Sequence, residues 1–138
     1  MIIVDASVAL KWLVLEDPPE LINKSRALLS QFLAGKEQLS APDILLYELG
    51  NVLSHKTSLN IHDINSAWDI FKSIDLPTIR VDTVTIKKAI ALSSKYQVSV
   101  YDAAYVVLAV DKNALLLTCD KKFIKAVNLP FVKDLADY

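Results

Sequence analysis

Length, composition and charge limit the classes to which this chain can belong. It has 138 residues, of which 53% are hydrophobic and only 2 are glycine and 5 proline, so we expect one compact domain over residues 1–138 rather than a disordered chain. The 15 basic and 16 acidic residues give a net charge of −1, which excludes a broad basic surface for indiscriminate nucleic-acid binding.

Cysteine usage and apolar runs bear on the location of the protein. The single cysteine, Cys119, excludes a disulfide framework and a zinc ribbon and favours a reducing, cytoplasmic compartment. Asp5 and Lys11 interrupt the apolar N-terminus, and no basic region precedes it, so we expect no signal peptide. No apolar run approaches the ~20 residues of a membrane span, so we expect no anchor.

Short apolar runs alternate with helical patterns along the chain. In order, we predict a strand over 1–4, helices over 7–15 and 18–35, a strand over 38–42, helices over 43–56 and 61–74, a strand over 78–81, helices over 82–97 and 101–112, a strand over 114–118, a short helix over 120–127 and an edge strand over 130–134. The strands are continuous in apolar residues rather than alternating, which indicates a parallel sheet covered by helices on both faces. The predicted fold is therefore a three-layer α/β/α sandwich, in which ligands bind beyond the carboxyl ends of the strands.

Acidic residues stand at two of these strand ends. Asp5 follows MIIV, and Asp120 follows ALLLT after one residue, so both are expected at the same rim of a parallel sheet. Either one alone is equally well explained as a turn or helix-cap residue. Two of them in one small sheet favour a functional site.

Two further acids are candidates for the same rim. Asp102 is the one carboxylate within VSVYDAAYVVLAV, where an unpaired charge is costly to bury, so it serves as a helix N-cap, as a functional acid, or as both. Glu48 lies in the middle of a predicted helix, where Asn51 and His55 would complete an ordinary polar stripe. By itself, Glu48 is better explained as part of that stripe.

A convergence of these acids would have a chemical meaning. The set consists of Asp5, Glu48, Asp102 and Asp120. Such carboxylates would repel one another unless a cation lay between them. Hard oxygen ligands of this kind suit one or two Mg²⁺ or Mn²⁺ ions, which activate water against a phosphodiester. Their convergence is the hypothesis that a structure must test.

Polar neighbours of the acids fit the same hypothesis. The candidates are Ser7 and Thr118 for orienting carboxylates or water, Asn51 for contacting a water or phosphate, and Lys121 and Lys122, with Lys125, for contacting phosphates. Several of them also have an ordinary explanation, as a helix cap for Ser7, part of a polar stripe for Asn51, or a solvated helix face for the lysines. The aromatic residues Trp12, Trp68, Tyr101 and Tyr105 are better explained as core or groove aromatics.

Four short segments carry a resemblance to a known family. They are IIVDASV with Asp5, YELGNVL with Glu48, SVYDAAYVVLA with Asp102, and LLTCDKKF with Thr118 and Asp120. In this order, across essentially the whole chain, they resemble the PIN-domain ribonucleases, in particular the small toxins of VapC-type toxin–antitoxin pairs. Each motif alone is weak, whereas the ordered set of four is a strong match.

The resemblance implies a five-stranded parallel sheet and an endoribonuclease that cleaves RNA with Mg²⁺ or Mn²⁺ held by the four acids. It further implies homodimers and an antitoxin protein whose C-terminal segment occupies the active-site groove. Two alternatives stay open. One is a catalytically inactive PIN-fold binding module. The other is a phospho-receiver-like regulatory domain, although a receiver needs paired acids where this chain has only Asp5.

Overall fold

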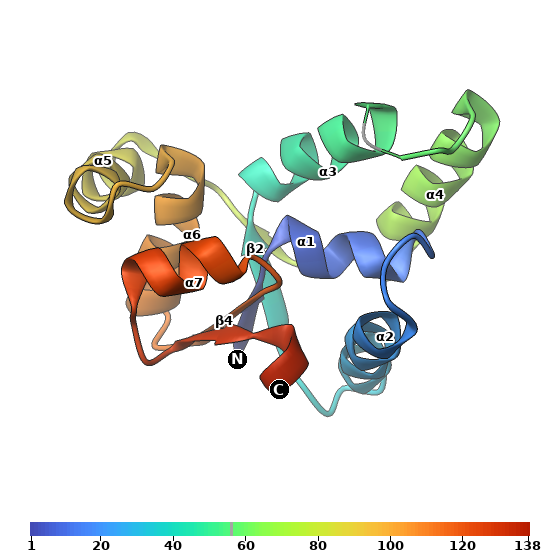
Figure 1. The fold of residues 1–138 in the computed structure, drawn as a ribbon, viewed down its shortest axis with the longest axis horizontal. Helices are drawn as coiled ribbons and strands as arrows, with labels where there is room; N and C mark the ends of the chain where they lie inside the picture. Colours follow the sequence, from blue (N-terminus) through green and yellow to red (C-terminus); the bar gives the residue numbers. More distant parts are fainter. Residues whose placement is uncertain (56) are drawn as a thin grey trace.

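A five-stranded parallel sheet forms the centre of the molecule in the computed structural model, which describes residues 1–55 and 57–138 (Figure 1). The strands are β1 (Ile2–Val4), β2 (Leu39–Pro42), β3 (Thr78–Ile79), β4 (Leu115–Thr118) and β5 (Val132–Asp134). Their order in space is β3-β2-β1-β4-β5, and every neighbouring pair is parallel. The strand that comes first in the chain therefore lies in the middle of the sheet.

Helices cover both faces of this sheet. They are α1 (Ala6–Ala9), the 3-10 turn η1 (Leu10–Trp12), α2 (Pro19–Leu33), α3 (Ile44–His55), α4 (Ile61–Ile74), α5 (Thr83–Tyr96), α6 (Val100–Asp111), α7 (Lys121–Val127) and the 3-10 turn η2 (Leu135–Asp137). Helix α6 packs against β1, β2 and β4 on one face, and α1 and α2 lie on the other (Figure 1). The predicted three-layer α/β/α sandwich is confirmed.

Burial explains why β1 and most of β4 are apolar. Ile3 and Val4 of β1 and Leu116 and Leu117 of β4 are all 0% exposed, because helices cover both faces of the sheet. Helix α6 is equally apolar, and its residues 103–109 are all buried. None of the helices in the described parts of the chain is long and apolar enough to cross a membrane.

Two predicted elements are longer than those in the structure. The helix predicted over 7–15 is a single turn of α-helix followed by η1, and it ends at Trp12. The strand predicted over 78–81 ends at Ile79, because the backbone N–H of Val81 donates to the Asp43 side chain (3.0 Å) instead of to a neighbouring strand. The predicted end of the helix over 43–56 lies outside the described residues.

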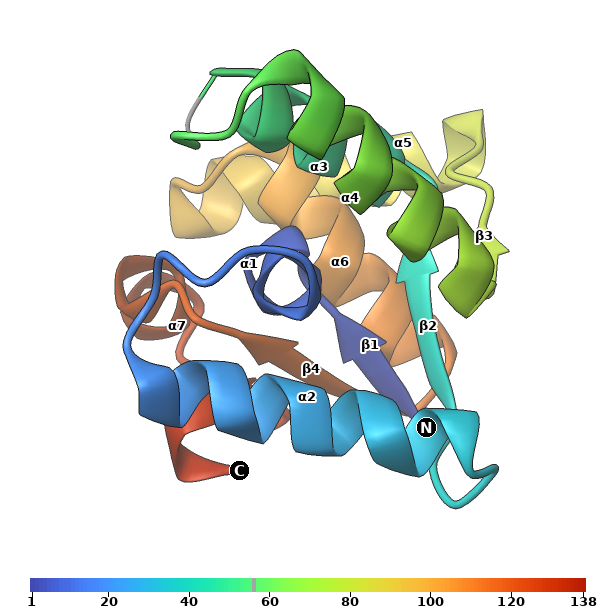
Figure 2. The same ribbon diagram turned by 90° about the vertical axis from the view of Figure 1, so that its right-hand side faces the viewer.

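The direction of the strands sets where a site can lie. Figure 2 shows β1 and β2 pointing toward the end of the molecule where α3 lies, while the N-terminus lies at the opposite end. All five strands are parallel, so their carboxyl ends share one edge of the sheet. Asp5 follows β1 and Asp120 comes shortly after β4 at that edge.

Candidate active site

Asp5 and Thr118 meet where β1 and β4 end. Val4 pairs with Leu117 in the sheet, and the backbone N–H of Asp5 donates to the Leu117 carbonyl (3.0 Å). The Thr118 hydroxyl, which is fully buried, donates to Asp5 Oδ2 at 2.5 Å. The pairing of two parallel strands thus joins residues that are 113 positions apart in the chain.

A second hydroxyl, that of Ser7, completes a small network around Asp5. Ser7 Oγ donates to the same Asp5 oxygen, Oδ2 (2.8 Å), and accepts a hydrogen bond from the backbone N–H of Cys119 (3.0 Å). The N–H of Asp120 donates to the Thr118 hydroxyl (3.0 Å). Both side-chain hydrogen bonds to Asp5 fall on Oδ2, so among the described residues Oδ1 has no hydrogen-bond partner.

Asp120 caps the helix that follows it. Its Oδ1 accepts from the backbone N–H groups of Lys122 (2.9 Å) and Phe123 (3.0 Å), which are free donors at the start of α7. The cap explanation is therefore confirmed for Asp120. It occupies one oxygen of the carboxylate and fixes the orientation of the other.

Asp102 lies in the first turn of α6, but Ser99 is the residue that caps the helix. The backbone N–H of Asp102 donates to Ser99 Oγ (3.0 Å), so the N-cap explanation for Asp102 is wrong. Burial is the main cause that raises the pKa of Asp102, against the opposing hydrogen bond with Ser99. The charges of Asp5 and Asp120 raise it further.

Glu48 projects from α3 toward α6, where it meets Tyr105. The Tyr105 hydroxyl donates to Glu48 Oε2 at 2.5 Å, and the tyrosine is only 2% exposed. Burial is the main cause that raises the pKa of Glu48 to about 7, against the opposing hydrogen bond from Tyr105. The charges of Asp5 and Asp102 add to the rise. The sequence interpretation of Tyr105 as a core aromatic missed this contact, although its position one helical turn after Asp102 was a usable signal.

The four carboxylates together form a concentration of negative charge. Asp5 follows β1 and Glu48 lies in the middle of α3. Asp102 lies in the first turn of α6, and Asp120 directly precedes α7. The ion pairs found among residues 1–55 and 57–138 join other groups, so none of them neutralises these acids. A bound cation relieves this kind of mutual repulsion.

The donor set fits a hydrated divalent cation. Within the described part of the chain, no three carboxylate, imidazole or thiol groups lie close enough to form a ready-made metal cage. Mg²⁺ usually keeps several waters and binds one or two carboxylates directly, so an open arrangement suits it. Three of the acids have an oxygen that accepts no hydrogen bond from the described residues: Asp5 Oδ1, Glu48 Oε1 and Asp120 Oδ2.

The other residues singled out from the sequence lie around this group. Lys121 and Lys122 are exposed at the start of α7, beside Asp120. Asn51 is exposed one turn beyond Glu48, and its backbone oxygen lies 3.3 Å from the His55 ring.

Lys11 was not predicted. It is 4% exposed and donates to the Ser7 carbonyl (3.0 Å) while pairing with Asp17 (3.1 Å), so it supports the segment that carries Ser7.

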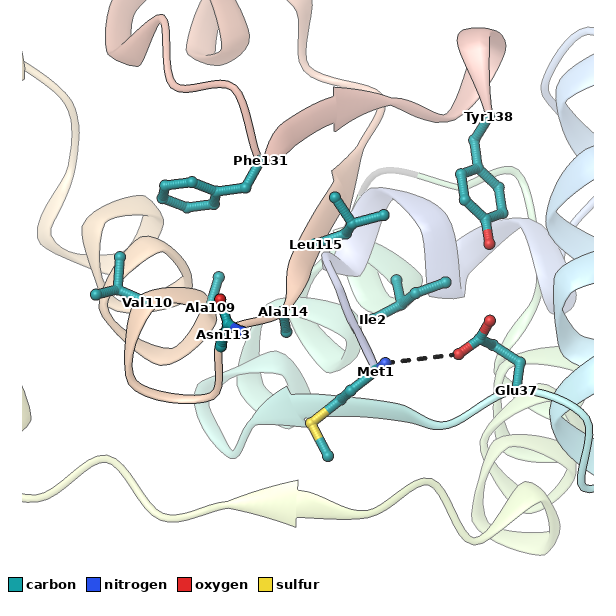
Figure 3. A pocket seen from close by; sticks show the side chains of 10 residues that line it. All are labelled: Met1, Ile2, Glu37, Ala109, Val110, Asn113, Ala114, Leu115, Phe131 and Tyr138. Atoms are coloured by element: carbon teal, nitrogen blue, oxygen red, sulfur yellow. Dashed lines mark ion pairs between the residues drawn. The ribbon is translucent and has the colours of Figure 1, made fainter.

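A cavity lies at the opposite end of the sheet (Figure 3). Its volume is about 520 Å³, and it is lined mainly by apolar side chains, including Ile2, Leu115 and Phe131. In this cavity the N-terminal amine of Met1 lies 3.8 Å from Glu37 Oε1, so the positive and negative charges compensate each other. The cavity contains none of the four carboxylates.

Comparison with known proteins gives a consistent family. Residues 2–129 match the PIN domain family. Ribonuclease VapC3 of Pyrobaculum aerophilum is 29% identical over 130 residues, covering 88% of this chain and 90% of that protein. Mycobacterium tuberculosis VapC20, a Sarcin-Ricin loop cleaving toxin, has a similar fold (TM-score 0.72, 18% identity, 96% and 97% of the two chains). A toxin-antitoxin complex from Klebsiella pneumoniae does too (TM-score 0.67, 15% identity, 98% of each chain).

Proposed function

This chain belongs to the PIN domain family, and from that premise we propose that it is a metal-dependent endoribonuclease that hydrolyses RNA phosphodiester bonds. PIN-domain nucleases generally use divalent metal ions. The observation that carries the proposal is the group of four carboxylates, uncompensated by the ion pairs of the described residues, at the carboxyl edge of the sheet. Membership of this family decides against the phospho-receiver alternative.

The residues divide into ligands and supports. Asp5, Glu48, Asp102 and Asp120 would hold one or two Mg²⁺ or Mn²⁺ ions. A bound divalent cation supplies positive charge at the phosphate and lowers the pKa of water. Ser7 and Thr118 hold Asp5 by Oδ2, which directs Oδ1 toward the ligand, and the Thr118 hydroxyl also holds the backbone before Asp120.

Exposed polar residues would bind the substrate. Lys121 and Lys122, which are exposed beside Asp120, would contact RNA phosphates, and the exposed Asn51 would contact a phosphate or water near Glu48. The net charge of −1 means that such local contacts and the metal, rather than a basic surface, hold the RNA.

The relatives suggest a biological setting. One is named a ribonuclease, one is described as a toxin that cleaves the Sarcin-Ricin loop, and one is a toxin-antitoxin complex. We extend this to the present chain as a single-domain cytoplasmic toxin over residues 1–138, active as a homodimer and controlled by a cognate antitoxin protein.

The decisive experiment compares the acidic site with the other end of the sheet. RNA is incubated with purified protein and Mn²⁺, and cleavage rates are measured for Asp5→Asn, Asp102→Asn and the control Glu37→Gln. We expect the first two substitutions to lower the rate at least about 100-fold and the control to leave it unchanged. Equal cleavage by all three variants would overturn the proposal. Calorimetry that detects no Mn²⁺ binding would favour an inactive binding module instead.

A further inference from the structure

Tyr105 stands out because a buried phenol reaches directly into the acidic group. Helix α6 is apolar on all sides over residues 103–109, and Tyr105 is 2% exposed among them. A hydroxyl in such surroundings needs a hydrogen-bond partner, since an unpaired polar group is costly to bury. The partner is a carboxylate from another helix, Glu48 Oε2, at 2.5 Å.

Glu48 depends on this contact more than the other acids depend on theirs. Asp5 is held by two hydroxyls close to the sheet, and Asp120 is held by two backbone N–H groups of α7. Glu48 has a longer side chain on a helix outside the sheet. Among the described residues, Tyr105 is the one from which its carboxylate accepts a hydrogen bond. Without that bond, the free rotamers of Glu48 would have to be ordered when a ligand binds.

Tyr105 also sets the position of Glu48 relative to Asp102. Asp102 and Tyr105 are three positions apart on α6, so they lie next to each other on the same helix face. Helix α6 therefore contributes the Asp102 carboxylate directly and holds the Glu48 carboxylate through the hydrogen bond from Tyr105. The hydroxyl occupies Oε2 and leaves Oε1 free.

We propose that Tyr105 is a positioning residue that presents Glu48 Oε1, in a fixed relation to Asp102, to the divalent cation. This inference rests on the proposed function, because it assumes that the four carboxylates hold a metal. This role differs from a purely structural one, in which the Tyr105 hydroxyl would only gain a hydrogen-bond partner in the protein core. A structural role would affect unfolding and leave the affinity for the cation unchanged.

Tyr105→Phe tests the inference, because it removes one oxygen atom and keeps the ring that packs in the core. Mn²⁺ binding is measured by calorimetry, together with metal-free thermal unfolding and RNA cleavage at low and high Mn²⁺. We expect Mn²⁺ to bind 10–100-fold more weakly, as is typical when a support of a metal ligand is lost, and excess Mn²⁺ to restore most of the cleavage. The matched control is Tyr101→Phe on the same helix, which is 63% exposed and should bind Mn²⁺ like the wild type.

A double-mutant cycle with Glu48→Gln separates action through Glu48 from any other effect. We expect Tyr105→Phe to cause little further loss of Mn²⁺ affinity once Glu48 is replaced. An undiminished second loss, or wild-type affinity in Tyr105→Phe alone, would overturn the inference while leaving the proposed nuclease intact. A protein that binds Mn²⁺ in this pattern but cleaves no RNA would support the inference and refute the proposed function. A wild type that binds no Mn²⁺ would refute both.

Discussion

At the amino ends of the strands, a cavity of about 520 Å³ is lined mainly by apolar side chains, whereas four carboxylates lie toward the carboxyl ends. The charges at the first end, the Met1 amine and Glu37, lie opposite each other. At the second end, burial raises the pKa of Glu48 and Asp102, the charges of neighbouring acids raise it further, and the four acids take part in none of the ion pairs found in the described residues. Under the proposed function, the uncompensated charge marks the active site, and the cavity does not.

Asp120 is the acid whose charge can best be separated from its structural role, which is to cap helix α7. Asn caps a helix about as well as Asp, so Asp120→Asn should keep α7 in place while removing one negative charge. We expect RNA cleavage with Mn²⁺ to fall about 100-fold with little change in the unfolding temperature. Asp120→Ala, which also removes the cap, should lose about 1 kcal/mol of stability in addition. Full activity of the Asn variant would place Asp120 outside the site.

Thr118 is expected to have the next largest effect. Thr118→Val keeps the shape of the side chain but removes the hydroxyl that donates to Asp5 and accepts from the Asp120 backbone. We expect Mn²⁺ affinity to weaken about 10–100-fold and the free energy of unfolding to fall by about 1–3 kcal/mol, since buried groups lose their partner. Calorimetry and denaturant unfolding measure the two effects, and Thr118→Ser should preserve both properties.

The pH dependence of metal binding sharpens the comparison further. The pKa of Glu48 is raised to about 7, so below that pH its carboxyl carries a proton that a cation must displace. Mn²⁺ affinity should therefore rise with pH, by up to about tenfold per unit below the pKa, and level off above it. Calorimetric titrations on both sides of the pKa measure this slope. Glu48→Gln should flatten it, and an unchanged slope would show that another group controls binding.

The smallest expected effect concerns stability: at neutral pH, removing an acidic charge should stabilise the metal-free protein at the carboxyl end of the sheet and destabilise it at the amino end. A carboxyl whose pKa is raised on folding binds its proton more tightly in the folded state, so metal-free stability falls as the pH rises from the unfolded value of 4.5 to about 7. Glu48→Gln should thus stabilise the metal-free protein above that range, by only about 1 kcal/mol because Glu48 is partly solvated, and have no effect below it.

Glu37→Gln should do the opposite at neutral pH. It removes the partner of the N-terminal amine, and such half-exposed pairs contribute at most about 1 kcal/mol. Unfolding of both variants in a chelator, at neutral and acidic pH, measures the contrast. Two substitutions that shift stability in the same direction would contradict the charge difference between the two ends.

Strand positions and the shared rim could be predicted from the sequence because they depend on local signals. The continuous apolar runs before Asp5 and Asp120 are set by burial on both faces of a parallel sheet, and this property appears in each run separately. The five-stranded parallel sheet is confirmed, as is its edge strand β5. The network of Ser7 and Thr118 around Asp5 follows from the same strand pairing, and the structure places both hydroxyls there.

Contacts between helices could not be predicted in the same way. Whether Glu48 belongs to a solvated stripe or to the site depends on how α3 packs near α6, which brings together residues 57 positions apart. The choice of cap before α6 was ambiguous for another reason. Ser99 and Asp102 are both good capping residues, and sequence patterns locate a helix boundary only to within a few residues.

The central place of β1 affects when this domain can work. Its partner β4 begins more than a hundred residues later, and Asp5 finds Thr118 across 113 positions. A chain emerging from the ribosome exposes Asp5 long before β4, α6 and α7 exist. Until then, the first strand has no neighbour on one side, and the carboxylates remain scattered along an incomplete polypeptide. The acidic site can therefore assemble only when synthesis of the chain is nearly complete.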